Sequence, residues 1–585
     1  MTVTTGERIA VSMVSFLASA MAVAYAIDRI GLAIAPLVVL VVSIAAAAAT
    51  FLWLRPIPRG ERGETTAFIA IIAAVFGYLL WLARPTFLPI GGGPDLAHHL
   101  VLIDYIERHW RLVHDPGLGA VMGEMADYTP GVHLLAALAG AWTRTDGLHA
   151  IYPIVALSVA LKAALVFAIA TRVLPGTVPR VNARGAPPPL ARARRLGSAS
   201  LPSAASRWPQ APFAIAAVVM LFAPREYFLR SFTDHSFLAQ VVSELFAVAM
   251  WWALVGWYER PSIAAAIVFA IAGAGAFLTW PVWIGPLLLM LVVVIALRGD
   301  VSVRDRLTAI AAAVGPIAIV AVVHSAGRVR AAGIAATSGF VVWPSIDVFG
   351  AWFLVLASIG VVVAATNRPA RSIVWLLAAI ALQAGALFVV AAHSGADRPY
   401  LALKMAYLAI YPMAIAGAVV FAVVGRAFQA RRDGGPKRAA LRTQVAWLIA
   451  AALFVVVARP LIKEPRPTRV VSEPMYLAGQ WARANVPAEC VDYLVRDDDS
   501  AYWLHLAVLG NARQTDRTRE AATFDPKAAL IRWIQPAGLP YAITDDFDAL
   551  PKDIRTSVDV VRRFGPAAIV KRRGRSTCEQ AAGPR

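Results

Sequence analysis

Long apolar stretches recur along almost the whole chain, and they constrain its fold more than any other feature. Hydrophobic residues make up 59% of the 585 residues, and charged residues only 16%. A bilayer core is about 30 Å thick, so a helix needs about 20 apolar residues to cross it. The sequence therefore predicts a polytopic all-α membrane protein, with the apolar stretches as its transmembrane helices.

Thirteen stretches have the composition of membrane spans. They are 8–28, 31–54, 66–83, 149–172, 211–224, 237–257, 261–278, 282–298, 307–327, 346–366, 372–392, 401–425 and 443–461. A fourteenth candidate, 129–143, is short, and counting it would place the arginine-rich segment after 149–172 on the wrong side of the membrane. We therefore interpret 129–143 as a juxtamembrane or re-entrant helix. The first span is too long, and too closely followed by a second, to be a cleaved signal peptide.

Basic residues predict the orientation. The net charge is +19, but the arginines cluster between spans, as in loops kept in the cytoplasm, and do not indicate nucleic-acid binding. The clusters lie at 55–62, 172–207 and 426–442. This places the N-terminus inside and segments 84–148, 225–236, 328–345, 393–400 and the tail outside. Segment 173–210, rich in Pro, Ala, Arg and Ser, is expected to be a disordered linker that contacts anionic lipid.

The tail has a different composition, which predicts two domains: a transmembrane domain 1–462 and an extracytoplasmic α/β domain 463–585. Helices are expected at 474–485 and 500–510, and strands at 491–495 and 567–571. The two cysteines, Cys490 and Cys578, both lie in the tail. Outside the cytoplasm they either form a disulfide or remain as buried thiols, and the sequence leaves both open. The run 497–499 of three aspartates reads as a solvated turn rather than a calcium loop.

The first long outer loop, 84–148, contains the most informative stretch. Gly91–Gly93 and Pro94 allow a sharp turn and a close approach of the backbone. The residues from Leu96 onward predict an amphipathic helix with one apolar face. Asp95 lies at the start of this helix, where it is either a functional carboxylate or a simple N-cap. Two adjacent histidines, His98 and His99, follow one turn later and point to different faces, so at most one can join Asp95.

Polar residues collect in the outer loops rather than inside the spans. Besides those above, the candidates are Asp104, Tyr128, Arg225, Asp234, His235, Arg398 and Lys404. Carboxylates near cations suit a reaction in which a carboxylate takes a proton from a hydroxyl while the cations hold a phosphate. Arg398 is also explained by snorkelling. Lys404 is more informative, because it lies four residues into an apolar segment, where an unmatched charge is costly.

The arrangement resembles the GT-C superfamily of membrane glycosyltransferases, which includes protein O-mannosyltransferases, aminoarabinose transferases and arabinofuranosyltransferases. The resemblance rests on Pro94-Asp95 with His98-His99, the stretch Tyr128–Leu135, Arg172 at the end of a span, Thr279-Trp280-Pro281 and the outer tail. It covers nearly the whole chain in architecture, with short motifs.

The resemblance implies an inverting transfer of a sugar from a polyprenyl-phosphate donor at the outer face, with Asp95 as the base. The remaining candidates would bind substrate: His98, His99, Asp104, Tyr128, Arg225, Asp234, His235, Arg398 and Lys404. Many relatives have a second acid beside the first, where this chain has Leu96. A divalent metal at Asp95, Asp234 or His235 stays open, and no other cofactor is expected.

The expected partners are the lipid-linked donor, an acceptor glycan, lipid or protein, and membrane lipids, in a bacterial cytoplasmic membrane. The chain lacks a glycine-rich nucleotide fingerprint after a strand. Two other functions remain open. A flippase or exporter of lipid-linked glycans requires a polar path across the spans, although intramembrane charges are few and no repeat is evident. A polysaccharide polymerase or ligase would use the same donors to join longer glycans.

Overall fold

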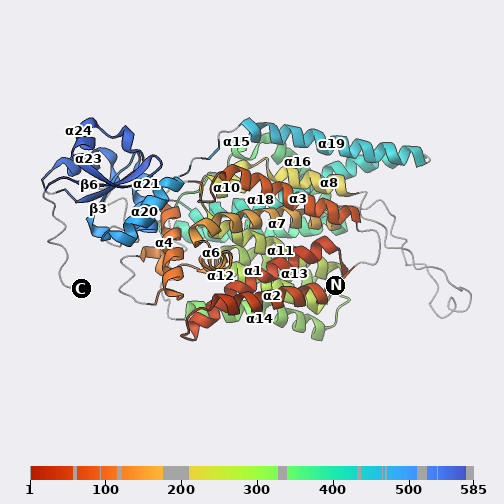
Figure 1. The fold of residues 1–585 in the computed structure, drawn as a ribbon. Helices are drawn as coiled ribbons and strands as arrows, with labels where there is room; N and C mark the ends of the chain where they lie inside the picture. Colours follow the sequence, from red (N-terminus) through yellow and green to blue (C-terminus); the bar gives the residue numbers. More distant parts are fainter. Residues whose placement is uncertain are drawn as a thin grey trace, which may run out of the picture.

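Long, roughly parallel helices form a bundle, and a small mixed sheet lies beyond one end of it in the computed structural model (Figure 1). The structure describes residues 2–56, 62–91, 94–114, 122–174, 210–326, 339–396, 398–430, 436–463, 466–467, 469, 471–509, 524–536 and 538–574. Within this part, nine helices are long and apolar enough to cross a membrane. The protein is therefore a multi-pass helical membrane protein, as predicted.

All thirteen predicted spans fall on helices. The long ones are α1 (Thr5–Arg29), α2 (Pro36–Trp53), α3 (Arg62–Ala83), α7 (Gly147–Val173), α11 (Leu238–Glu259), α14 (Val303–Ser325), α17 (Arg371–His393), α18 (Tyr400–Ala430) and α19 (Pro436–Lys463). The shorter ones are α8 (Ala211–Leu221), α12 (Ile263–Thr279), α13 (Ile284–Ala296) and α16 (Ala351–Thr366). Because four fall short of 18 residues, the count of thirteen spans stays a prediction.

One predicted span is wrong in detail. The expected continuous helix 346–366 is divided into α15 (Ile346–Phe349) and α16. Gly350 separates them with a φ of 83°, a left-handed conformation that glycine adopts without strain and that ends a helix.

One end of the bundle holds the N-terminus. Strand β1 (Thr2–Val3) pairs in parallel with β2 (Arg55–Pro56). Arg172, at the end of α7, donates hydrogen bonds to Glu7 on α1 and Glu259 on α11. Arg55 and Arg172 therefore lie at the same end as the start of α1, as their predicted clusters require. The linker 175–209 lies outside the described residues, as do the side chains of 426–442.

The opposite end holds the loops that the sequence predicts to lie outside the membrane, and we keep the name outer loops for them. Helix α4 (Pro94–His109) lies across this end of the bundle, close to α6 (Gly131–Thr143) (Figure 1). Its predicted apolar face is confirmed, because Leu100, Ile103 and Ile106 are fully buried. Two short helices, α9 (Arg225–Phe228) and α10 (Arg230–Thr233), form the second outer loop. Residues 123–126, 281–283 and 368–370 form single 3₁₀ turns.

The tail forms the predicted α/β fold. Its sheet has the order β3-β4-β6-β5, with β3 (Val491–Leu494) parallel to β4 (Tyr541–Thr544), and β6 (Ala567–Arg572) antiparallel to β4 and β5 (Val558–Phe564). Its helices are α20 (Glu473–Asn485), α21 (Asp498–Trp503), α23 (Pro526–Ile534), α24 (Lys552–Thr556) and the π-helix η10 (Leu504–Val508). The predicted helix 474–485 and both predicted strands are confirmed, whereas the predicted helix 500–510 is divided into α21 and the π-helix η10. Cys490 is disulfide-bonded, and Cys578, the other cysteine of the sequence, lies outside the described residues.

Candidate active site

The first two outer loops meet at Gly91, four residues before Asp95. Gly91 has a φ of 103°. A Cβ atom there would lie 2.5 Å from Ser236 Oγ and 2.9 Å from the carbonyl oxygen of Thr233. Backbones approach this closely only where a side chain is absent. The segment that leads into α4 is therefore packed against the loop that contains Asp234.

Asp95 lies in the first turn of α4, and its side chain is outside the part of the chain that the structure describes. His98 and His99 have different partners, Tyr502 and His133. Which of the two histidines joins Asp95 stays a prediction.

His99, in the first half of α4, belongs to a cluster of aromatic and imidazole rings. Its Nδ1 shares a hydrogen bond of 2.9 Å with Nε2 of His133 on α6, and both side chains are buried. The ring of Tyr128 packs edge-on against both imidazoles, with centroids 5.3 and 5.8 Å away. Trp280, at the end of α12, lies 6.3 Å from Tyr128. Tyr128 and His99 are therefore together, as expected, and His133 was missed although it belongs to the motif that begins at Tyr128.

The second outer loop carries a compact set of charges. Glu226 forms an ion pair with Arg230 and a contact of 3.3 Å with Nε2 of His235. The hydrogen bond with His235, and the charge of Arg230, hold the pKa of Glu226 below its usual value. Asp234 accepts a hydrogen bond of 2.8 Å from Thr233 and lies 3.3 Å from Arg230. Asp234 and His235 thus belong to one polar cluster, joined by a glutamate that was not among the predicted site residues.

Lys404 is buried beside this cluster. Its Nζ lies 3.0 Å from the centroid of the Phe237 ring, 5.0 Å from that of Tyr407 and 5.2 Å from that of Tyr400. The faces of aromatic rings attract cations, and this attraction is stronger away from water. Since Phe237 follows Asp234 by three residues, the predicted cation and the predicted acid lie in the same region.

The third outer loop contacts both the second and the fourth. The ring of Phe340 lies 4.9 Å from that of His235, and a Cβ at Gly339 would lie 2.9 Å from the ring of Tyr400. Arg398 is exposed and Arg225 is half-buried. Asp397, Arg328 and Arg330 lie outside the described residues. Lys404 is therefore the predicted phosphate ligand with the best-defined surroundings.

Two predicted site residues of α4 contact the C-terminal domain. His98 Nε2 shares a hydrogen bond of 2.7 Å with the hydroxyl of Tyr502. The carboxylate of Asp104 accepts two hydrogen bonds from Arg483, of 2.7 and 3.1 Å, and forms an ion pair with Arg108. Its oxygens are thus engaged within the protein, and its predicted contact with substrate stays a prediction.

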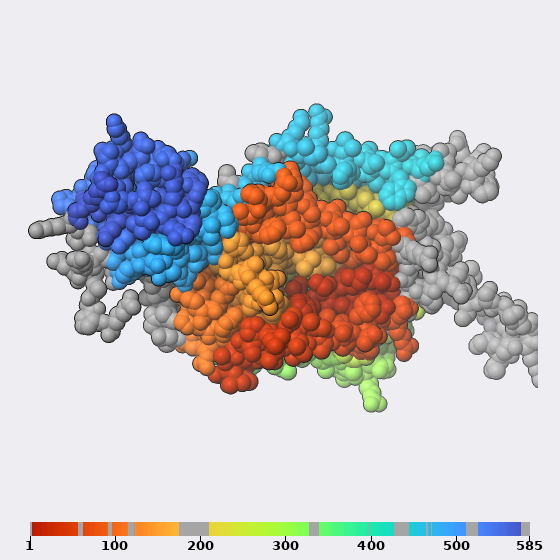
Figure 2. Space-filling view, viewed as in Figure 1, coloured from red at the N-terminus to blue at the C-terminus, as the bar shows by residue number. Residues whose placement is uncertain are grey.

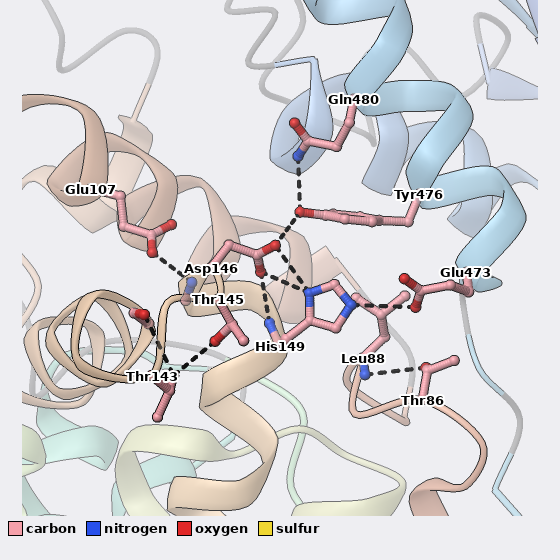
Figure 3. A network of polar contacts seen from close by, with 12 residues as sticks. Thr86, Leu88, Glu107, Thr143, Thr145, Asp146, His149, Glu473, Tyr476 and Gln480 are labelled. Carbon is pink, nitrogen blue, oxygen red and sulfur yellow. Dashed lines mark hydrogen bonds and ion pairs between the residues drawn. The ribbon is translucent and has the colours of Figure 1, made fainter.

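A second polar network joins the start of α7 to α20 (Figure 3). Sequence reasoning did not predict this network. Asp146 accepts a hydrogen bond of 2.6 Å from Tyr476 and lies 2.9 Å from Nδ1 of His149. Nε2 of His149 lies 3.3 Å from Glu473. Gln480 donates to the hydroxyl of Tyr476. The available signal was an aspartate before an apolar run, which is typical of a helix N-cap.

Glu107 lies beside this network on α4. Its Oε1 accepts a hydrogen bond of 2.5 Å from the backbone N–H of Gly147 (Figure 3). Burial, together with the charges of Asp146 and Asp104, raises the pKa of Glu107 to about 8. This carboxyl therefore gains and loses its proton near neutral pH.

An ion pair lies in the interior of the helix bundle. Lys162 on α7 contacts Glu244 on α11, and neither side chain is exposed. Glu244 also accepts a hydrogen bond of 2.6 Å from Tyr411 on α18. The sequence identified both charges as intramembrane but did not pair them.

No group of three or more His, Cys, Asp or Glu side chains within the described residues is arranged to hold a metal ion. Asp234 and His235 are instead engaged with Thr233, Arg230 and Glu226.

The fold and this outer end define a multi-pass membrane protein with a polar site beneath an α/β domain. The sequence matches no known family profile and no curated protein. Among solved structures, the chain is similar to ArnT from Cupriavidus metallidurans bound to undecaprenyl phosphate, with 15% identity, a TM-score of 0.45, and coverage of 87% of this chain and 98% of that one. It is also similar to the Archaeoglobus fulgidus oligosaccharyltransferase complexed with Zn and sulfate, with 15% identity, a TM-score of 0.45, and coverage of 83% and 68%. For the archaeal oligosaccharyltransferase AglB with an inhibitory peptide and a dolichol-phosphate, the identity is 14%, the TM-score 0.37, and the coverage 83% and 70%.

Proposed function

We propose that the protein is a glycosyltransferase that moves a sugar from a polyprenyl-phosphate donor to an acceptor hydroxyl at the outer face of the cytoplasmic membrane. One observation carries the proposal: outer loops far apart in the sequence converge. Gly91, four residues before Asp95, packs against the loop that contains Asp234. Lys404 packs on the ring of Phe237, which follows Asp234 by three residues. An acid-bearing segment and a buried cation therefore share one end of the bundle.

The proposed step is an inverting displacement. Asp95 takes the proton of the acceptor hydroxyl, and the acceptor oxygen bonds to the anomeric carbon from the face opposite the phosphate. The bond between that carbon and the phosphate oxygen breaks, and the lipid phosphate leaves with the electron pair. Lys404 stabilises this phosphate, which gains negative charge as it leaves, and such stabilisation is worth most in a water-poor setting.

The test uses purified protein in lipid vesicles with a radiolabelled polyprenyl-phosphate sugar and candidate acceptors. We expect wild-type protein to form labelled product with inverted stereochemistry. Asp95→Asn should lower transfer at least about 100-fold, because a positioned base contributes about 10²–10⁴-fold. Asp300→Asn is the matched control, since this aspartate is exposed and pairs with Arg298 away from the site. Full activity of Asp95→Asn removes this residue from the mechanism, and movement of the lipid across the bilayer without product supports a flippase instead.

A further inference from the structure

We propose that the C-terminal domain is a working part of the transfer site, with Tyr502 and Arg483 as positioning residues that hold α4, the helix that starts beside Asp95. This inference rests on the proposed function. Figure 2 shows the light-blue residues of this domain seated directly on the orange residues at the outer end of the bundle. Side-chain hydrogen bonds from Tyr502 and Arg483 of this domain join it to α4.

Tyr502 fixes the first turns of α4. Its side chain is 2% exposed, and its ring packs 5.2 Å from that of Phe524. The π-helix η10 begins two residues later, and such irregular turns occur mostly as single, functionally placed interruptions. The hydroxyl of this buried tyrosine lies 2.7 Å from Nε2 of His98. This contact lies one helical turn from Asp95.

Arg483 fixes the middle of the same helix. Its guanidinium donates two hydrogen bonds to the carboxylate of Asp104, and one of 2.9 Å to the carbonyl of Val508. Arg483 and Asp104 are both mostly buried, with 18% and 11% of their side chains exposed. A bidentate arginine–carboxylate pair fixes direction as well as distance. One side chain thus ties α20, η10 and α4 together.

The same helix α20 also holds the start of α7. Tyr476 donates to Asp146, and Glu473 lies against His149, which itself contacts Asp146 (Figure 3). The domain therefore holds α4 and α7 at once and sets the position of one relative to the other. Since the apolar face of α4 packs on the bundle, the helix is held on two sides, and the orientation of its first turn depends on both.

The experiment compares Tyr502→Phe, Arg483→Ala, Asp104→Ala and the double variant Asp104→Ala/Arg483→Ala with wild-type protein in lipid. We expect Tyr502→Phe and Arg483→Ala each to lower kcat at least about 10-fold, because misplaced reacting groups are costly. The donor KM should change less than about 3-fold, and the double variant should be no worse than Arg483→Ala. Arg496→Ala is the control, because Arg496 is exposed and pairs with Asp546 on the same domain. The exchanged pair Asp104→Arg/Arg483→Asp should recover part of kcat.

Hydrogen exchange of the α4 amides supplies a readout that does not need activity. We expect Arg483→Ala to speed exchange in α4 and to leave α11 unchanged. Unchanged kcat and unchanged α4 exchange would overturn the inference, as would a loss of kcat that simply follows a loss of folded protein. If wild-type protein transfers no sugar, the proposed function fails, and the exchange rates of α4 alone decide whether the domain positions this helix.

Discussion

Lys162 and Glu244 form an ion pair in the interior of the bundle, and we predict how its removal changes the stability of the fold. Both side chains are fully buried. The carboxylate also accepts hydrogen bonds from Tyr411, at 2.6 Å, and Gln240, at 3.3 Å. The ammonium lies 5.3 and 5.6 Å from the ring centroids of Phe228 and Tyr411. Neither charge has access to water, so each depends on the other.

Loss of one partner should cost far more than loss of both. Removing one member of a buried pair leaves a buried charge and costs about 3–5 kcal/mol, whereas replacing both with neutral groups of similar volume is nearly neutral. We therefore expect Lys162→Met and Glu244→Gln each to destabilise the fold by about 3 kcal/mol. The double variant should lie within about 1 kcal/mol of wild type, because the amide of Gln still accepts from Tyr411.

The measurement is the free energy of unfolding in mixed micelles titrated with a denaturing detergent, arranged as a double-mutant cycle. A coupling energy of about 5 kcal/mol is expected, since the single variants cost about 6 kcal/mol together and the double variant only about 1 kcal/mol. The comparison is Asp300→Asn, at an exposed carboxylate that pairs with Arg298, and we expect it to leave the free energy of unfolding nearly unchanged. Single variants that cost less than about 1 kcal/mol, or a double variant that costs their sum, would refute the reasoning.

Three further predictions concern the outer end. Glu107→Gln should flatten the pH dependence of stability. Burial raises the pKa of Glu107 from 4.5 to about 8, so between these pH values the folded state binds a proton that the unfolded state has lost. The wild-type protein therefore loses stability as the pH rises from about 4.5 to about 8. Melting temperatures from pH 4 to 9 check this, and an unchanged slope would contradict it. Gly91→Ala should lower transfer at least about 10-fold, because the new Cβ would lie 2.5 Å from Ser236 Oγ. Gly31→Ala is the control: Gly31 has a similar φ of 82° but no atom within 4 Å of the new Cβ, so transfer should be unchanged. Lys404→Gln should lower kcat about 100-fold through loss of phosphate stabilisation, and a mere rise in donor KM would argue against that role.

The helices were predictable because each follows from local composition. Apolar runs of suitable length mark α1 and α7, and the spacing of Leu100, Ile103 and Ile106 marks the buried face of α4. The break at Gly350 was missed because a single glycine inside an apolar run is compatible with a continuous helix.

The contacts of the site were less predictable, since they join residues far apart in the sequence. Arg483 and Asp104 are separated by 379 positions, and nothing near either residue indicates the other. His133 and Glu226 were within reach of sequence reasoning, because both lie in segments already singled out. Their roles became clear only when folding placed them against His99 and His235.

The ion pair within the bundle also bears on how the chain is made. Lys162 leaves the ribosome 82 residues ahead of Glu244, so α7 reaches the translocon carrying a cation whose counter-ion has yet to be synthesised. A lysine near the centre of a segment opposes its insertion by about 3 kcal/mol. The rest of α7 is apolar enough to cross a membrane, and these residues offset the cost. Final seating of α7 must then wait for α11, so this part of the bundle closes only after Glu244 has been synthesised.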